Sequence, residues 1–389
     1  MKRRQGVLVL LAVHRLAFLG LCGLVTVLAP WYEERRHADW VLALWETGDS
    51  FWGHFYTWDG QAYLTLARDG YLPGDQLCAF YPLWPSLLKL AAPLFGGSAA
   101  LTGLVLANLF AWIGSALFYR LVERRWGRDL ARDSLWLWLA LPGTLFLGFP
   151  YTEGLFFLLL MVFWTGMEDE RPGPAAIAGF LLPMTRAVGV FVLLPLAWHL
   201  GTGALRSWRG TGAGWTRLPA HLCRQPLAVV SIAVVAGYTT YFTLMALWTG
   251  NPFEGFAAQR HYANQPSVEN IVNLPGFATA FADIGQLHGP TDSVLDRLLF
   301  VLLLLGLAPM WRLDPRCFWW GLGAGVIPAL SNWLLSYQRF VPMVFPLPVV
   351  LALWCRRRGS RIWFYYYLGL ELLLQAWFLV RHMNLFWVA

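Results

Sequence analysis

Hydrophobic residues form long, nearly uninterrupted runs along most of this sequence. The runs lie near residues 7–29, 97–119, 133–148, 150–167, 226–248, 294–311, 317–335, 341–354 and 362–380. Most have roughly the 15–25 residues that a helix rising about 1.5 Å per residue needs to cross a bilayer. The pattern predicts an all-α polytopic membrane protein that forms a single transmembrane domain over residues 1–389.

The run at 175–200 does not fit a single helix. Basic segments flank both of its ends, and the polar stretch "PMTR" interrupts its middle. We predict two short helices that meet at Pro183–Arg186, because proline lacks an N–H and tolerates such a break. The count is then about eleven crossings. The segment 81–97 is either interfacial or a short hairpin, which changes that count by up to two.

Basic residues cluster in the polar segments that should face the cytoplasm. The clusters lie at the N-terminus, at 120–132, 201–224, 312–316 and 355–361. By the positive-inside rule these segments and the N-terminus are cytoplasmic. The first apolar run is longer than a signal-peptide core and lacks an A-x-A site, so we expect it to be a retained span. The other polar segments, at 31–95, 149–153, 183–186, 249–292 and 336–339, then face away from the cytoplasm.

Composition narrows the class of protein further. Only 13% of residues are charged and the mean hydropathy is +0.50, which excludes an ordinary soluble domain. The net charge of +7 reflects clusters between apolar runs, a topology signal and not a nucleic-acid footprint. The five cysteines have no paired spacing, so neither a disulfide framework nor a zinc site is indicated. No D-x-D is present either; no metal site is predicted, and dependence on a divalent ion stays open to experiment.

The first outer loop carries an acid at the start of a short helical pattern. In "TWDGQAYLTLARDGY", Asp59 begins the pattern and Gly70 follows its end, where a C′ glycine is expected. The helix is too short and too polar to span, so it should lie in the membrane interface. Asp59 is then either an N-cap or a general base at the membrane surface.

Four cationic residues fall on the same predicted face. They are Arg186, Arg260, His261 and Arg339. Arginine near membrane depth is costly and usually has a partner. A phosphate suits guanidinium groups, which bind its oxygens bidentately. The alternatives to phosphate binding are that these side chains snorkel to lipid headgroups or that they pair with Glu153 or Glu254.

Two further segments place polar groups on this face. A short helix beginning at Phe253 would bring Phe256, Gln259 and Arg260 within one turn of each other. Glu153 opens a hydrophobic helix, where it either stabilises the helix dipole or takes part in function.

The order of these motifs resembles a known family. "WDGQAYLTLARDGY" followed by "FYPLWPSLLKL" is similar to the "WD…Y…IA…GY" and "FFPLYP" patterns of PIG-V-type mannosyltransferases, which belong to the GT-C superfamily. The resemblance continues in order through "FPYTEGLFFLLL", "LLPMTRAVGVFVLLP", "TGNPFEGFAAQRHY" and "YQRFVPMVFPLPVVLA", and covers most of the chain. It implies a GT-C-type bundle with interfacial helices in the first outer loop (31–95) and a second long outer loop (249–292).

The resemblance also implies a reaction. It is the inverting transfer of a hexose, typically mannose, from a polyprenyl-phosphate donor to a lipid-linked or cell-envelope glycan, on the extracytoplasmic face and without a cofactor. Asp59 would be the base, and the four cationic residues would hold the donor phosphate. Candidates for lining the substrate cavity are Trp58, Tyr63, Tyr81, Glu153, Gln259 and Gln338.

The chain is shorter than many eukaryotic members of that family, which favours a bacterial plasma-membrane protein. Its partners would be the lipid donor, the glycan acceptor and membrane lipids, with no nucleic acid; a small membrane subunit stays open as a further partner. The alternatives are a transporter or flippase of lipid-linked sugars and a catalytically inactive scaffold.

Overall fold

The structure is a computed structural model that describes residues 2–28, 51–211, 215–357 and 361–388. Within these ranges it contains helices, turns and loops but no strand, and only one isolated bridge, between Gln286 and Ser293. The prediction of an all-α protein is therefore confirmed. The part of the predicted first outer loop before residue 51 lies outside the described residues.

The helices follow one another along the chain with short breaks. The α-helices are α1 (Lys2–Leu28), α4 (Asp59–Asp69), α5 (Leu83–Ala91), α6 (Ala99–Trp126), α7 (Arg128–Ala140), α8 (Glu153–Glu168), α9 (Pro172–Thr185), α10 (Leu193–Thr211), α11 (Leu218–Cys223), α12 (Ala228–Thr249), α13 (Glu254–Ala257), α14 (Leu274–Ala282), α15 (Val294–Leu313), α16 (Pro315–Gly321), α17 (Ile327–Asn332), α18 (Pro346–Arg357) and α19 (Ile362–Met383). The short turns are η1 (Phe51–Phe55), η2 (Gln76–Ala79), η3 (Ala92–Phe95), η4 (Pro142–Gly148), η5 (Ala187–Val192), η6 (Trp215–Arg217), η7 (Ala258–His261), η8 (Glu269–Ile271), η9 (Leu322–Val326), η10 (Tyr337–Arg339) and η11 (Val341–Met343), of which η9 is a π-helix.

Six helices of the described chain are long and apolar enough to cross a membrane: α1, α6, η5 with α10, α12, α15 and α19. Two more spans are counted if bent pairs are taken together: η4 with α8, bent by 98°, and η10–η11 with α18, bent by 78°. The chain is thus a multi-pass membrane protein. The predicted count of about eleven is not confirmed among the described residues, where α7 and α9 have only 13 and 14 residues. Such helices rise about 20 Å, less than the roughly 30 Å of a bilayer core.

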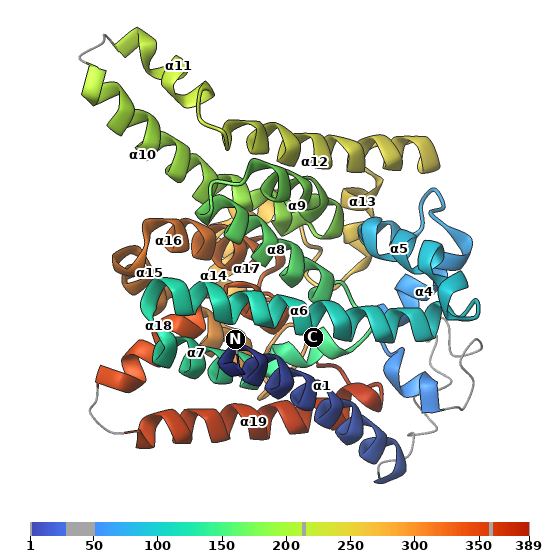
Figure 1. Ribbon diagram of the computed structural model, residues 1–389. Helices are drawn as coiled ribbons and strands as arrows, with labels where there is room; N and C mark the ends of the chain where they lie inside the picture. The colour runs from blue at the N-terminus through green and yellow to red at the C-terminus, as the bar shows by residue number, and fades with distance from the viewer. Residues whose placement is uncertain (1, 29–50, 212–214, 358–360, 389) are drawn as a thin grey trace.

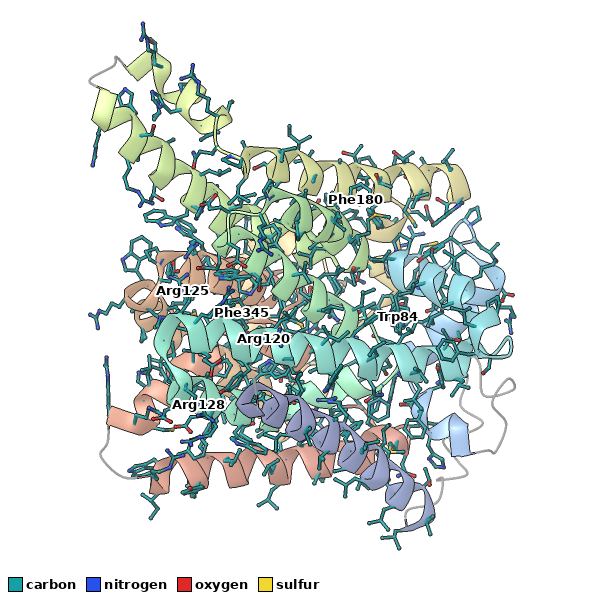
Figure 2. All side chains as sticks on the ribbon, in the orientation of Figure 1. Trp84, Arg120, Arg125, Arg128, Phe180 and Phe345 are labelled. Carbon is teal, nitrogen blue, oxygen red and sulfur yellow. The ribbon has the colours of Figure 1, made fainter. Side chains whose placement is uncertain are left out.

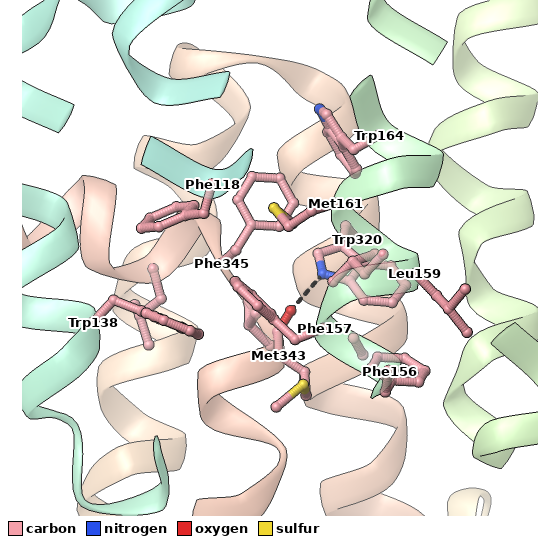
Figure 3. Packing of buried hydrophobic residues seen from close by; sticks show 14 of the residues in the cluster. Phe118, Trp138, Phe156, Phe157, Leu159, Met161, Trp164, Trp320, Met343 and Phe345 are labelled. Carbon is pink, nitrogen blue, oxygen red and sulfur yellow. Dashed lines mark hydrogen bonds between the residues drawn. The ribbon is translucent and has the colours of Figure 1, made fainter. Parts of the chain in front are cut away.

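The long helices pack as successive layers. Figure 1 shows α12, α9, α8, α6 and α7 one below another, and each packs against the next. Aromatic side chains fill the space between the layers: Trp138 stacks on Phe157 at 4.2 Å, and Trp320 donates a 2.9 Å hydrogen bond to the Met343 carbonyl (Figure 3). A Cβ at Gly154 would lie 2.7 Å from a carbonyl oxygen of α6, so glycine permits the close contact of α8 with α6.

Charged residues gather at both ends of the bundle. At the end where α6 and α8 finish, Arg125 contacts Glu168 and Asp314, and Arg316 pairs with Glu168 at 2.8 Å. The predicted basic clusters at 120–132 and 312–316 therefore lie together; Arg125 is labelled at the left of Figure 2. The opposite end carries α4 and the start of α8, which is roughly 22 Å long from Glu153 to Glu168.

Candidate active site

Asp59 lies at the first position of α4, which spans Asp59–Asp69 and is closed by Gly70 with φ of 80°. These bounds agree with the sequence prediction. The N-cap position belongs to Trp58, and the Asp59 carboxylate accepts instead from Nη1 of Arg339. The N-cap interpretation of Asp59 is therefore wrong. Trp58 has φ of 51°, a left-handed conformation that costs energy in a residue with a large side chain.

Glu153 is the centre of a buried charged cluster at this point. Its Oε1 lies 2.6 Å from Nη1 of Arg186 and 2.6 Å from Nε of Arg339. The same Arg339 bonds to Asp59, so one guanidinium joins the two carboxylates. Glu153 has no exposed surface, whereas a quarter of the Asp59 side chain is exposed. Asp59 is thus the more accessible of the two acids in the cluster.

Each buried charge of the cluster lies where a helix is interrupted. Glu153 begins α8 at the 98° bend, and Arg339 ends η10 before the 78° bend. Arg186 has extended backbone between α9 and η5, which confirms the predicted break at Pro183–Arg186. Irregular backbone at membrane depth is tolerated where it lines a protein interior or a cavity. Three separate breaks therefore bring these side chains together.

Hydroxyl groups complete the hydrogen bonding of the cluster. The Tyr63 hydroxyl donates to Thr152 at 3.4 Å, and the Thr152 hydroxyl donates to Glu153 at 3.4 Å. Arg186 also donates to Thr152, at 3.2 Å. Burial, together with the negative charges of Asp59 and Glu153, raises the pKa of Tyr63. Tyr63 therefore keeps its proton and acts as a donor here.

Aromatic rings hold the other side of Arg339. Its guanidinium lies 5.3 Å from the ring of Phe146 and 5.0 Å from the ring of Tyr151, in cation–π geometry. The Tyr151 hydroxyl donates to the Thr57 carbonyl at 2.8 Å, two residues before Asp59. Tyr151 thus connects Arg339 to the loop that carries Asp59.

The C-terminal segment supports the same loop. The Thr57 hydroxyl lies 3.0 Å from Nε2 of His382, and the Trp58 indole donates to the Phe386 carbonyl at 3.1 Å. Trp58 also packs edge-to-face on Trp387. The sequence did not reveal His382, Thr152 or Tyr151 as site residues. Their only signal was polar character within or beside an apolar run.

Gln338, predicted to line the cavity, belongs to a buried network behind Arg339. Its backbone N–H donates to Asp296 at 3.1 Å, and its side-chain amide lies 3.0 Å from Nε2 of His288. Burial lowers the pKa of His288 to about 4, so the ring is neutral at pH 7. Asp296 and His288, also missed from the sequence, therefore fix the backbone that carries Arg339.

The segment predicted to be the second outer loop folds close to the predicted helix, as α13 followed by η7, beginning at Glu254. Arg260 and His261 are exposed, and neither side chain forms an ion pair or hydrogen bond with other described residues. The next residue, Tyr262, donates to the Gln76 carbonyl at 3.1 Å; burial and the negative charge of Asp59 raise its pKa. This segment thus lies within electrostatic reach of Asp59, while its two cations stay outside the buried cluster.

The structure also places the other acids and side chains that the sequence singled out. Of the two acids proposed as arginine partners, Glu153 is confirmed, but Glu254 accepts from the Gly74 N–H and from Asn251 instead. Gln259 is half-buried on η7. Tyr81 stacks on a tyrosine of α12 with ring centres 4.4 Å apart. Within the described ranges no group of three or more His, Cys, Asp or Glu residues could hold a metal ion.

Neither a protein-family model nor a curated protein matches this sequence. Among solved structures, the chain is similar to the Archaeoglobus fulgidus oligosaccharyltransferase tethered to an acceptor peptide, with 14% identity and a TM-score of 0.47. It is also similar to oligosaccharyltransferase AglB of that organism in complex with an inhibitory peptide and a dolichol-phosphate (14%, 0.47) and to the apo form (12%, 0.48). The alignments cover 96–98% of this chain and 55–56% of those, so this chain spans about half their length.

Proposed function

We propose that this chain is an inverting glycosyltransferase of the GT-C type. It moves a hexose, most often mannose, from a polyprenyl-phosphate donor to a lipid-linked or cell-envelope glycan on the extracytoplasmic face of a bacterial plasma membrane. The observation that carries the proposal is the Asp59 carboxylate, partly exposed and held by Arg339 at the meeting point of three broken helices.

Asp59 acts as the general base. Its Oδ2 is held by Arg339, while Oδ1 has no hydrogen-bond donor among the described residues. This free oxygen accepts the proton of the acceptor hydroxyl as that hydroxyl oxygen attacks the anomeric carbon. The bond from the anomeric carbon to the phosphate oxygen breaks, and the polyprenyl phosphate leaves with the electron pair. Attack opposite the phosphate inverts the anomeric centre.

The leaving phosphate needs cations beyond the buried cluster. Arg186 and Arg339 are already balanced by Glu153 and Asp59, so these four groups carry no net charge. Arg260 and His261 are exposed, and their side chains have no ion-pair partner among the described residues. They supply the positive charge that the transition state requires as charge grows on the phosphate. Arg186 and Arg339 bind the same phosphate from the buried side.

A lipid-linked donor fits the position of this site. The charged cluster is at the ends of apolar helices, at the opposite end from the Arg125–Glu168 pair. The isoprenoid tail can stay in the bilayer while the sugar enters the polar region around Asp59. Trp58, Tyr63, Tyr81 and Gln259 stay candidates for the surrounding wall, whereas Gln338 supports Arg339 from the buried side.

The test is transfer of label from radioactive polyprenyl-phosphate mannose to extracted membrane lipids by the purified chain, with the glucose donor in parallel. The proposal predicts a labelled glycolipid whose new anomeric configuration is opposite to that of the donor. Retention of configuration would contradict the inverting mechanism. Movement of the labelled donor across vesicles without a new glycosidic bond would favour the flippase alternative.

A further inference from the structure

Two adjoining pockets lie at the end of the bundle away from Asp59. They have volumes of 240 and 430 Å³ and are formed where α7, α18 and α19 meet. Both are lined by Arg132, Asp133, Arg361 and Phe364. Residue 364 is 18 residues before His382, which contacts the Asp59 loop, so roughly 27 Å of α19 separate the pockets from the candidate active site. The pockets are therefore a distinct feature.

The pockets contain more positive than negative charge. The buried carboxylate of Asp133 accepts from Arg356 at 2.8 and 3.0 Å and from Arg361 at 3.2 Å. Arg132 is more weakly engaged: it lies 3.3 Å from Asp133 and 3.9 Å from Asp129. Three arginines thus face two aspartates, which leaves one net positive charge.

The negative charge of Asp133 persists at neutral pH. Burial alone would raise the pKa of Asp133, but hydrogen bonds from Arg361 and Arg356 outweigh it and hold the pKa below its ordinary value. Asp133 therefore stays ionised and cannot release its arginines by protonation. The side chains of Arg132 and Arg361 are about half exposed, at 52% and 48%, so both can reach a ligand in the opening.

One wall of the pockets is continuous with the lipid-facing surface. The second pocket is lined by Trp136, Tyr365 and Leu368 in addition to the shared residues. Tyr365 is 60% exposed, and α19 is one of the apolar helices long enough to span. Tryptophan and tyrosine at the end of a span lie at headgroup level. The charged part of the pockets thus lies where a lipid headgroup would be, and the apolar wall lies where the acyl chain would begin.

We propose that these pockets bind one anionic phospholipid of the surrounding bilayer. Its headgroup phosphate accepts hydrogen bonds from Arg132 and Arg361, and the first part of an acyl chain lies along Trp136 and Leu368. Basic pockets between membrane helices are suited to such headgroups. The bound lipid joins α7, α18 and α19, so it stabilises the folded chain by mass action.

The experiment is thermal unfolding of the purified full chain in a neutral detergent, followed by tryptophan fluorescence. Phosphatidylglycerol and phosphatidylcholine of equal chain length are titrated separately, with glycerol 3-phosphate as the soluble source of the same phosphate chemistry. The variant is Arg132→Gln, because Arg356 and Arg361 still neutralise Asp133 when Arg132 is lost. The matched control is Arg124→Gln, an arginine of similar exposure (46%) in an ion pair at the same end of the bundle.

Phosphatidylglycerol should raise the unfolding midpoint saturably, and phosphatidylcholine should not. Arg132→Gln should weaken the apparent affinity by about tenfold or more, the effect of one lost hydrogen bond to a charged group, while Arg124→Gln leaves it unchanged. Equal stabilisation by both lipids, or an equal loss in the two variants, would overturn the site. Saturable stabilisation by glycerol 3-phosphate at the same concentration as the lipid would overturn the lipid assignment.

Discussion

Replacing Glu153 by glutamine should destabilise the fold far more than replacing Asp59 by asparagine. Glu153 is fully buried and receives hydrogen bonds or ion pairs from Arg186, Arg339 and Thr152. Glutamine keeps the shape of the side chain but leaves two buried guanidinium groups with one carboxylate between them. Asp59, by contrast, is partly exposed, and its loss leaves Arg339 still paired with Glu153.

The structure sets the size of the difference. Breaking a buried ion pair by removing one partner costs about 3–5 kcal/mol, because a charge is left buried without compensation. That cost lowers the ratio of folded to unfolded chains by roughly two hundred- to five thousand-fold. Losing a partly exposed pair costs about 1 kcal/mol or less. The two acids of one cluster should therefore differ by several kcal/mol in the free energy of unfolding.

The assay is unfolding of the purified chain by sodium dodecyl sulfate in mixed micelles, followed by tryptophan fluorescence. The double variant Glu153→Gln with Arg186→Gln restores the charge balance, so its loss should be smaller than the sum of the two single losses. If Glu153→Gln unfolds at the wild-type detergent fraction, or if Asp59→Asn is the more damaging change, the description of the buried cluster is wrong.

Three further predictions concern the surroundings of the site. Arg260→Gln should lower kcat/KM for the donor by roughly ten- to a hundredfold and leave the unfolding midpoint unchanged, since Arg260 is exposed and has no described partner; steady-state kinetics with full-length donor measures it, and an unaltered kcat/KM would remove Arg260 from the phosphate site. Gly143→Ala should reduce turnover because the added Cβ would overlap the Gln338 carbonyl oxygen, whereas the control Gly173→Ala has open space around it and should transfer sugar at the wild-type rate. Lowering the pH from 7 to 5 should remove about 2 kcal/mol of stability through His288, whose pKa falls from an ordinary 6.5 to about 4 on folding, so the unfolded chain binds the proton first. The free energy of unfolding, measured at both pH values, should fall less in His288→Gln than in the wild type. An equal fall in the variant and the wild type would contradict this prediction.

Local features of the site could be predicted from the sequence because local rules determine them. Gly70 marks the end of the Asp59 helix since glycine adopts the left-handed conformation without a steric cost. The interruption at Arg186 follows from the polar residues beside Pro183 within an apolar run. The length of the hydrophobic runs predicted the membrane class, but it does not fix the number of spans, because several runs are divided between short helices and bends.

The contacts of the site could not be predicted because they join distant parts of the chain. Glu153 and Arg339 are 186 positions apart, and Thr57 and His382 are 325 positions apart. A periodic pattern says which face of one helix is apolar but not which other helix it meets. The sequence therefore left open whether the arginines pair with a protein acid or stay free. In the structure, Arg186 and Arg339 pair with Glu153, whereas Arg260 has no acidic partner among the described residues.

The most direct test of the account is the rate of sugar transfer by Asp59→Asn beside the matched control Asp69→Asn. Both acids lie on α4, and Asp69, at the other end, is 42% exposed and among the described residues forms an ion pair with its neighbour Arg68 alone. If Asp59 is the base, Asp59→Asn should lose about a hundredfold or more in kcat while Asp69→Asn keeps the wild-type rate. Transfer by Asp59→Asn at the wild-type rate would contradict the account.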